Sequence, residues 1–309
     1  MLTRTHPTAN IQRQQDNRSA TTVQGLSQQG QGYHRPHMSD IASLLLSVKL
    51  PVMPEVAHAL IRTLNDADAD ITTVTRIIEK DPGLTATLLR MANSAIFGLS
   101  RSVNSLEGAI SVVGMAHIRA RALSICLANA FPFPPTLDRL DFWRSSMVCA
   151  GYARWLAGSI AMDEQQAWLT GMMMRLGELI IAQRMPDALE HIEAKPRSPM
   201  TRWVRERETV GFDEGEIGAE ITRRWDFPEV VSLALQTSAR PMTDGTAPLG
   251  AIVHLAALLS NPASPPSQPL DELPITIIRT LGLDLEKLQK TIPSAESLSD
   301  ISMLQAQPG

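Results

Sequence analysis

The sequence is poor in aromatic residues, in cysteine and in net charge, and it has no long apolar run. Aromatics make up 4% of the 309 residues, and 28 basic against 32 acidic side chains leave a net charge of -4. Such a balance gives no reason to expect a nucleic acid or an anionic membrane as the main partner. A membrane span needs about 18 or more apolar residues, and a signal peptide needs an apolar core near the N-terminus. Neither is recognised, so we expect no membrane association and a cytoplasmic location.

The two cysteines lie in apolar segments with a helical pattern. Cys126 is in SICLANA and Cys149 is in SMVCAGYA. This context predicts buried thiols in a reducing compartment rather than a disulfide framework.

Composition divides the chain into a folded middle and two tails. Residues 1–38 are rich in Gln, Asn, Ser, Thr and Gly, and we expect them to be disordered because they offer little apolar surface to bury. A proline-rich stretch, 261–269, starts a C-terminal part, 261–309, in which residues 273–290 predict a short helix.

Helical spacing and capping signals predict an all-α fold. Asp81-Pro82 is an N-cap followed by a proline at the first helical position, and the apolar face that follows is expected to continue to Gly98. Asn104 and Glu107 predict a capping box for a short helix that ends at Gly114. No convincing strand alternation is present, and the 14 methionines and small alanine-rich faces are typical of helices packed on helices.

Residues 50–131 carry motifs that resemble the HDOD domain of bacterial signalling proteins. The most specific motifs are LPVMPEVA, Asp81-Pro82, the block ANSAIFG ending at Gly98, and Ser105-Leu106-Glu107 before Gly114. Within that block, Asn93, Ser94, Phe97 and Gly98 are expected to be structural. The likeness continues less densely to about residue 260.

This resemblance implies a helical fold with two lobes. We expect an N-terminal lobe over 39–135 and a second lobe over 136–260 that is similar to the HD phosphohydrolases, with Pro132–Pro135 as the hinge. In those enzymes, His and Asp side chains bind one or two metal ions that activate water for attack on a phosphoester.

The resemblance also implies where such ligands would stand, and this chain has other residues there. The altered positions are Ser145, Met174, Arg175, Glu214, Ser238 and Ala257. A thioether or a guanidinium cannot replace the expected His and Asp, so we expect no metal, no cofactor and no catalytic residue at these positions. Arg175 is expected to pair with Glu178 or with Glu214, or to point to solvent.

Other motifs have ordinary structural explanations that we prefer. Glu55 and His58 lack the second copy that a di-metal helical site needs, and Asp187 with His191 lacks an accompanying nucleophile motif. The run 172–174 of methionines is expected to be helical core rather than a soft-metal site or a peptide groove. The basic and aromatic segments Arg202–Arg207 and Arg223–Trp225 are expected to be salt-bridged helix surfaces rather than a nucleic acid surface. His34 and His37 are expected to have no role.

These expectations favour a non-catalytic signalling module that acts through protein–protein interaction. The resemblance implies bacterial pathways that control motility, stress or cyclic-nucleotide responses, with other signalling proteins as partners. Two alternatives remain: a cryptic metal-dependent phosphohydrolase, and a sensor that binds a nucleotide, for example through Arg175, without cleaving it.

Overall fold

The computed structural model describes most of the chain after residue 40. The described residues are 41, 45, 50–66, 68–94, 97, 102–194, 198–241, 247–261, 270–271 and 273–304, and for residue 303 the backbone alone is described. They all belong to one compact unit, Arg35–Gly309, and the regular elements among them are all helices. The all-α prediction is therefore confirmed. The expected disorder of 1–38, His34, His37, Gly98 and most of the proline-rich stretch lie outside the described residues.

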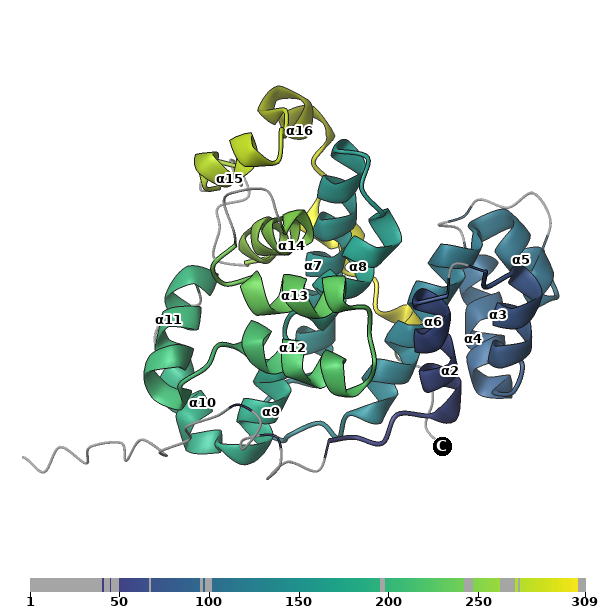
Figure 1. Ribbon diagram of the computed structural model, residues 1–309, viewed down its shortest axis with the longest axis horizontal. Helices are drawn as coiled ribbons and strands as arrows, with labels where there is room; N and C mark the ends of the chain where they lie inside the picture. The colour runs from purple at the N-terminus through teal and green to yellow at the C-terminus, as the bar shows by residue number, and fades with distance from the viewer. Residues whose placement is uncertain are drawn as a thin grey trace, which may run out of the picture. The chain divides into compact units, whose positions relative to one another are not determined.

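The first group of helices packs around α6 (Figure 1). Its members are α2 (Glu55–Leu64), α3 (Ile71–Ile78), α4 (Pro82–Ala92), α5 (Leu106–Val113) and α6 (Met115–Ala130).

Local capping signals explain most of these helix boundaries. The Asp81 carboxylate accepts a hydrogen bond from the Leu84 amide at 2.9 Å, which confirms the predicted cap of α4. Gly114 ends α5 with a φ of 96°, a conformation that favours glycine. Two boundary predictions were wrong. Helix α4 ends at Ala92, not near residue 98, and the cap of α5 is Ser105, whose hydroxyl accepts from the Gly108 amide, rather than Asn104.

The second group is built on α7, which packs along α8 and α14. Figure 1 shows α12, α13 and α14 stacked beside it, with α9 and α10 beyond α12 and with α11 at one side of the stack, where α11 contacts α14. The members of the group are α7 (Arg139–Ser159), α8 (Glu164–Met173), α9 (Leu176–Arg184), α10 (Pro186–Glu193), α11 (Pro199–Val210), α12 (Glu214–Arg224), α13 (Glu229–Thr237) and α14 (Pro248–Leu259). Helix α6 also contacts α8 and so joins the two groups. The lobe boundaries at 135 and 260 remain predictions.

The C-terminal part folds back onto the helices of both groups. It forms α15 (Ile275–Thr280), α16 (Leu285–Thr291), α17 (Ala295–Leu298) and a 3-10 turn, η1 (Ser302–Leu304). The short helical tail expected over 273–290 consists of two helices, separated by a turn at Leu281–Gly282. Helix α17 packs on α7, and η1 packs on α6 and α4.

The apolar core runs through both groups without interruption. It includes the methionines of 172–174, each at most 1% exposed, and both cysteines, which are buried free thiols. The predicted burial of these methionines and of both thiols is confirmed, whereas the reducing compartment stays a prediction. Among the described helices, none alone has the length and apolar character for a membrane crossing; α5 and α6 would reach that length together, but the chain bends by 116° between them.

Candidate functional site

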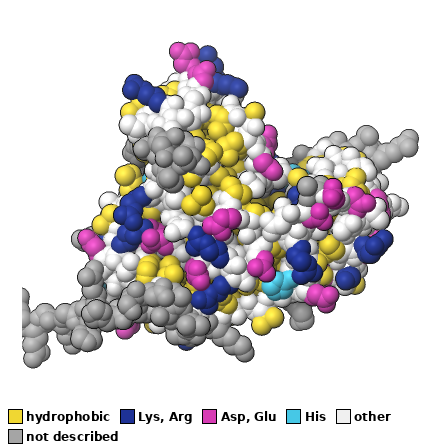
Figure 2. Space-filling model, in the orientation of Figure 1, with side chains coloured by type: hydrophobic (Ala, Val, Ile, Leu, Met, Phe, Trp, Pro, Cys, Tyr) yellow, Lys and Arg dark blue, Asp and Glu magenta, His cyan; other side chains and the backbone are white. Residues whose placement is uncertain are grey.

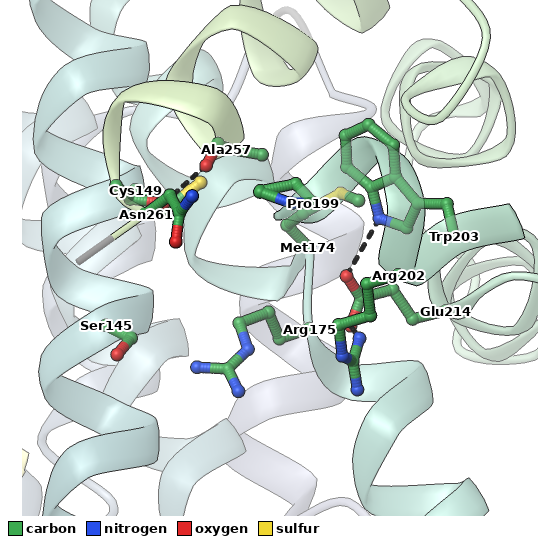
Figure 3. A pocket seen from close by; sticks show the side chains of 11 residues that line it. Ser145, Cys149, Met174, Arg175, Pro199, Arg202, Trp203, Glu214, Ala257 and Asn261 are labelled. Carbon is green, nitrogen blue, oxygen red and sulfur yellow. Dashed lines mark hydrogen bonds and ion pairs between the residues drawn. The ribbon is translucent and has the colours of Figure 1, made fainter. Parts of the chain in front are cut away.

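The structure brings five of the six altered positions to one pocket. Ser145 comes from α7, Met174 and Arg175 from the turn between α8 and α9, Glu214 from the start of α12, and Ala257 from α14. In the view of Figure 3 the Arg175 guanidinium lies between Ser145 and the pair formed by Arg202 and Glu214. The pocket has a volume of about 70 Å³.

Ser238 is buried at the end of α13 and does not line this pocket. It is connected to the pocket through its backbone carbonyl, which lies 2.7 Å from Nδ1 of His254. The His254 ring lies 5.3 Å from the Trp203 ring, and burial lowers the pKa of His254. A neutral imidazole therefore fills the space between Ser238 and the pocket wall.

A buried arginine on α11 forms the centre of the site. Arg202 is 5% exposed, and four carboxylates surround its guanidinium. Its Nη1 donates to Glu206 and, at 2.7 Å, to Glu214, and its Nε donates to Glu193 at 2.9 Å. Its Nη2 lies 3.5 Å from Glu178. Burial alone would lower the pKa of Arg202, but the carboxylates together raise it well above its ordinary value, so the cation is fixed.

Glu206 ties this cluster to the backbone of α12. Its second carboxylate oxygen accepts a hydrogen bond from the Glu214 amide at 2.8 Å, at the first residue of that helix. Burial raises the pKa of Glu206 well above its ordinary value. Arg202 lowers this pKa and the nearby Glu214 carboxylate raises it, but burial has the largest effect. Both oxygens of Glu206 accept hydrogen bonds, one from Arg202 and one from the Glu214 amide, and these contacts offset part of the cost of burying this acid.

Glu214 is held by two donors from α11. Besides Arg202, the Trp203 indole Nε1 donates to Glu214 Oε1 at 3.0 Å (Figure 3). Close helix packing fixes its position, because a Cβ on Gly177 of α9 would lie 2.1 Å from the Glu214 carbonyl oxygen. Only glycine permits this approach of α9 to α12.

The second arginine of the site pairs within its own turn. Arg175 Nη2 lies 2.5 Å from Glu178 Oε2, and its guanidinium lies 5.0 Å from the Phe142 ring centre. The first of the predicted pairings of Arg175 is therefore confirmed. The second is not formed, since Glu214 pairs with Arg202.

The HDOD domain family model matches residues 50–241. The chain belongs to the HDOD family. Similar solved structures include an HDOD domain protein of unknown function from Geobacter sulfurreducens, with a TM-score of 0.67 and 20% identity, covering 84% of this chain and 96% of that one. Another is a Shewanella amazonensis SB2B protein, provisionally named a phosphohydrolase, with a TM-score of 0.67 and 24% identity over 88% of this chain and 100% of the other. At these identities the likeness concerns the fold.

A curated relative also matches this HDOD chain. It is an uncharacterized protein of Treponema pallidum (strain Nichols), 23% identical over 189 residues, which cover 59% of this chain and 36% of that protein. The match thus spans about a third of the relative's length.

The donor set of this HDOD pocket does not fit the metal that the HD resemblance implies. A catalytic metal needs several imidazole, carboxylate or thiolate ligands and an open position for water. The pocket instead presents a thioether at Met174, a methyl at Ala257 and a guanidinium at Arg175, while both oxygens of Glu214 already accept from Arg202 and Trp203. Among the described residues, no group of three or more His, Cys, Asp or Glu side chains is arranged to hold a metal ion.

Sequence reasoning missed Arg202 as the centre of the site. The segment 202–207 was expected to be a salt-bridged surface, which was wrong for Arg202, Trp203 and Glu206 because all three are buried. A signal was available, since Trp203, Glu206 and Val210 follow a helical spacing that places Glu206 on the apolar face. For 223–225 the expectation is confirmed for the two arginines, which pair with Glu220 and Glu229, whereas Trp225 is buried.

The remaining candidate residues lie away from this pocket. Glu55 is exposed and pairs with Lys80 at 3.8 Å rather than building a site with His58, and Asp187 and His191 are exposed on α10. Among the family-motif residues, the Asn93 side chain bonds both the amide and the carbonyl of Val103, which closes the loop after α4. Ser94 and Phe97 line a second, larger cavity.

Proposed function

We propose that this HDOD chain is a non-catalytic signalling module that acts by binding other proteins. The observation that carries the proposal is the guanidinium of Arg202 among four carboxylates beside the pocket where HD enzymes hold metal. A guanidinium supplies a permanent positive charge and N–H donors, but it has no exchangeable position at which water could be activated. The cluster pairs these acidic groups with an internal cation, so they are poorly placed to bind a metal.

The solved relatives support a signalling role over an enzymatic one only in part. A Marinobacter aquaeolei VT8 protein, provisionally named a signal transduction protein, has a TM-score of 0.66 and 24% identity and covers 80% of this chain. The Shewanella protein supports the phosphohydrolase alternative by its provisional name. The residues of this chain favour the signalling role, because Met174, Arg175 and Ala257 supply neither a base at neutral pH nor the His and Asp ligands that the HD enzymes use.

Surface charge favours protein partners over nucleic acid. Figure 2 shows basic and acidic side chains interspersed over the face that it presents, without a basic region of the size that a phosphate backbone requires. Arg223 and Arg224, the basic pair nearest in pattern to a nucleic acid motif, are neutralised by Glu220 and Glu229.

Metal analysis combined with a hydrolysis assay tests the non-catalytic part. The untagged full chain is purified, its bound transition metals are quantified, and hydrolysis of bis(p-nitrophenyl) phosphate is followed with added Mn²⁺, Mg²⁺, Zn²⁺ or Fe²⁺. We expect substoichiometric metal and no metal-dependent rate. One tightly bound metal per chain together with metal-dependent hydrolysis abolished by Glu214→Gln would overturn the proposal.

A pull-down from the native cell tests the partner part. The full chain and a chain lacking residues 1–38 are used as baits, and retained proteins are identified by mass spectrometry. We expect signalling proteins to be retained by the full chain in a salt-resistant manner. Retention of nucleic acid, lost on nuclease treatment together with every protein, would contradict a protein-binding role.

A further inference from the structure

A second cavity lies between the two groups of helices and shares no lining residue with the first. Its volume is about 440 Å³, which falls within the roughly 300–1,000 Å³ typical of small-molecule sites. Helices α4, α6, α7 and α8 form its walls, and the C-terminal segment from Ser297 to Ser302 forms part of its rim. In Figure 1 the same segment, in yellow, runs from the side of α7 towards α6.

The charged groups of this cavity are mostly arginines. Arg90, Arg121 and Arg154 line it from three different helices, and Asp300 is the one carboxylate among the lining residues. Arg90 Nη2 donates to the Thr87 hydroxyl at 3.1 Å, which fixes its position at the wall. The balance of charge is thus opposite to that of the first site: three guanidinium groups accompany one acid here, whereas four carboxylates surround the single Arg202 there.

Arg121 is the most informative of the three. It is 8% exposed, its guanidinium carbon lies 3.3 Å from the Trp168 ring centre, and its Nε donates to His117 Nε2 at 3.2 Å. Its Nη1 is buried with no hydrogen-bond partner among the described groups. A buried guanidinium with an unused N–H is costly unless an anion satisfies it.

His117 contributes a donor rather than a charge. Burial first, then the charges of Arg121 and Arg154, lowers its pKa to about 3. The neutral ring accepts from Arg121 at Nε2, so Nδ1 carries the hydrogen and is a donor. Its ring meets Phe97 edge to face, with centres 5.3 Å apart.

Apolar groups occupy the rest of the wall. Met91, Met147, Phe97 and Trp168 line the cavity beside the arginines. Ser94 adds a buried hydroxyl that has no hydrogen-bond partner among the described groups. A bare inorganic anion would leave this apolar area and Ser94 without contacts, whereas an organic phosphate would use both.

We propose that this cavity binds a small phosphate ester with an apolar or aromatic body, its phosphate facing Arg121 and Arg154. Several guanidinium groups in fork geometry suit phosphate oxygens. The Asp300 carboxylate on the C-terminal rim opposes such a ligand, because it attracts the Arg121 guanidinium and would repel the phosphate. This site goes beyond the proposed function and does not depend on it.

Calorimetric titration of the full chain with AMP, inorganic phosphate and adenosine tests the proposal. We expect one AMP per chain, weaker binding of phosphate at the same site by competition, and no binding of adenosine. Arg154→Gln should weaken AMP binding by at least about tenfold, since a charged hydrogen bond is lost. Asp300→Asn should strengthen AMP binding. Arg144→Gln is the matched control and should leave AMP binding unchanged, because Arg144 is an exposed arginine of α7, the helix of Arg154, and does not line the cavity.

Each contrary outcome is distinct from a folding failure. Arg154→Gln and Asp300→Asn change groups that are not fully buried, so they remain usable if Arg121→Gln does not fold; circular dichroism of each variant checks this. No AMP binding, AMP binding equal in all variants, or phosphate binding as tight as AMP would each overturn the proposal. The first-pocket variant Glu214→Gln should bind AMP normally, which separates this site from the proposed function.

Discussion

Replacing Arg202 with methionine isolates what the buried cation does for the fold. The side chain is 6% exposed and keeps carboxylates of α9, α10, α11 and α12 together. Methionine fills a similar volume but leaves those acids without their shared cation. Removing one partner of a buried ion pair typically costs about 3–5 kcal/mol. We therefore expect Arg202→Met to lower the free energy of unfolding by at least about 3 kcal/mol, measured by urea denaturation of the full chain.

Arg144→Met is the matched control for this experiment. Arg144 also pairs with an acid, Asp141 at 3.1 Å, but its side chain is 48% exposed. Exposed pairs contribute about 0–1 kcal/mol. If Arg202→Met costs no more than Arg144→Met, the central role that we assign to Arg202 is wrong.

The pH dependence of the same variant gives a second test. Burial raises the pKa of Glu206 above its ordinary value and Arg202 opposes this rise, so without Arg202 the pKa of Glu206 in the folded state should rise further. A carboxyl with a raised folded pKa destabilises the fold above the unfolded pKa, and the penalty disappears as the pH falls through the folded value. The loss caused by Arg202→Met should therefore be larger at about pH 8 than at about pH 5. An equal loss at both would show that the acids are not the cause.

Three further predictions concern single groups. Burial raises the pKa of Asp213 to about 6, above the usual unfolded value of about 4. The free energy of unfolding of the native chain, relative to that of Asp213→Asn, should therefore increase as the pH falls from about 7 to about 5. A difference between the two chains that does not change with pH would contradict this. Gly177→Ala should cost at least about 1–3 kcal/mol by overpacking against the Glu214 backbone, whereas Gly83→Ala, whose new Cβ would meet its nearest neighbour at 3.4 Å, should be close to neutral in thermal unfolding. Burial raises the pKa of both thiols to about 12, so a thiol reagent should label neither cysteine in the folded chain and both after denaturation, and rapid labelling of the native chain would refute their burial.

Helix identity was predictable because its signals are local. Asp81 caps α4 as expected, and Gly114 stops α5. The shift of the α5 cap from Asn104 to Ser105 reflects two adjacent residues that both cap well. Just before these two residues, the backbone of Val103 is held by the side chain of Asn93, a contact over ten residues of sequence that a local pattern does not reveal.

Only part of the site was predictable, again because local sequence patterns do not reveal contacts between residues that are distant in sequence. The family resemblance, rather than any periodicity, indicated positions such as Ser145, Arg175 and Ala257, which the fold then brings to one pocket. The Arg202 cluster depends on four helices that meet, and Arg202 with Glu206 at i, i+4 spacing is what an exposed, salt-bridged helix also shows. No local signal distinguishes the buried version except the apolar neighbours of Glu206 along α11.

Helix α7 lines both cavities, and the two cavities differ in the balance of acidic and basic side chains around them. Ser145 and Cys149 face the first pocket from α7, whereas Met147, Gly151 and Arg154 face the second from the same helix. In the first, the acids already share an internal cation, so an added metal would have to displace a guanidinium held by several hydrogen bonds. In the second, an arginine N–H has no partner among the described groups, so an anion would add contacts without breaking any. The proposed anion site therefore lies on the arginine-rich side of α7, where a ligand would meet an unpaired N–H instead of a closed ion-pair cluster.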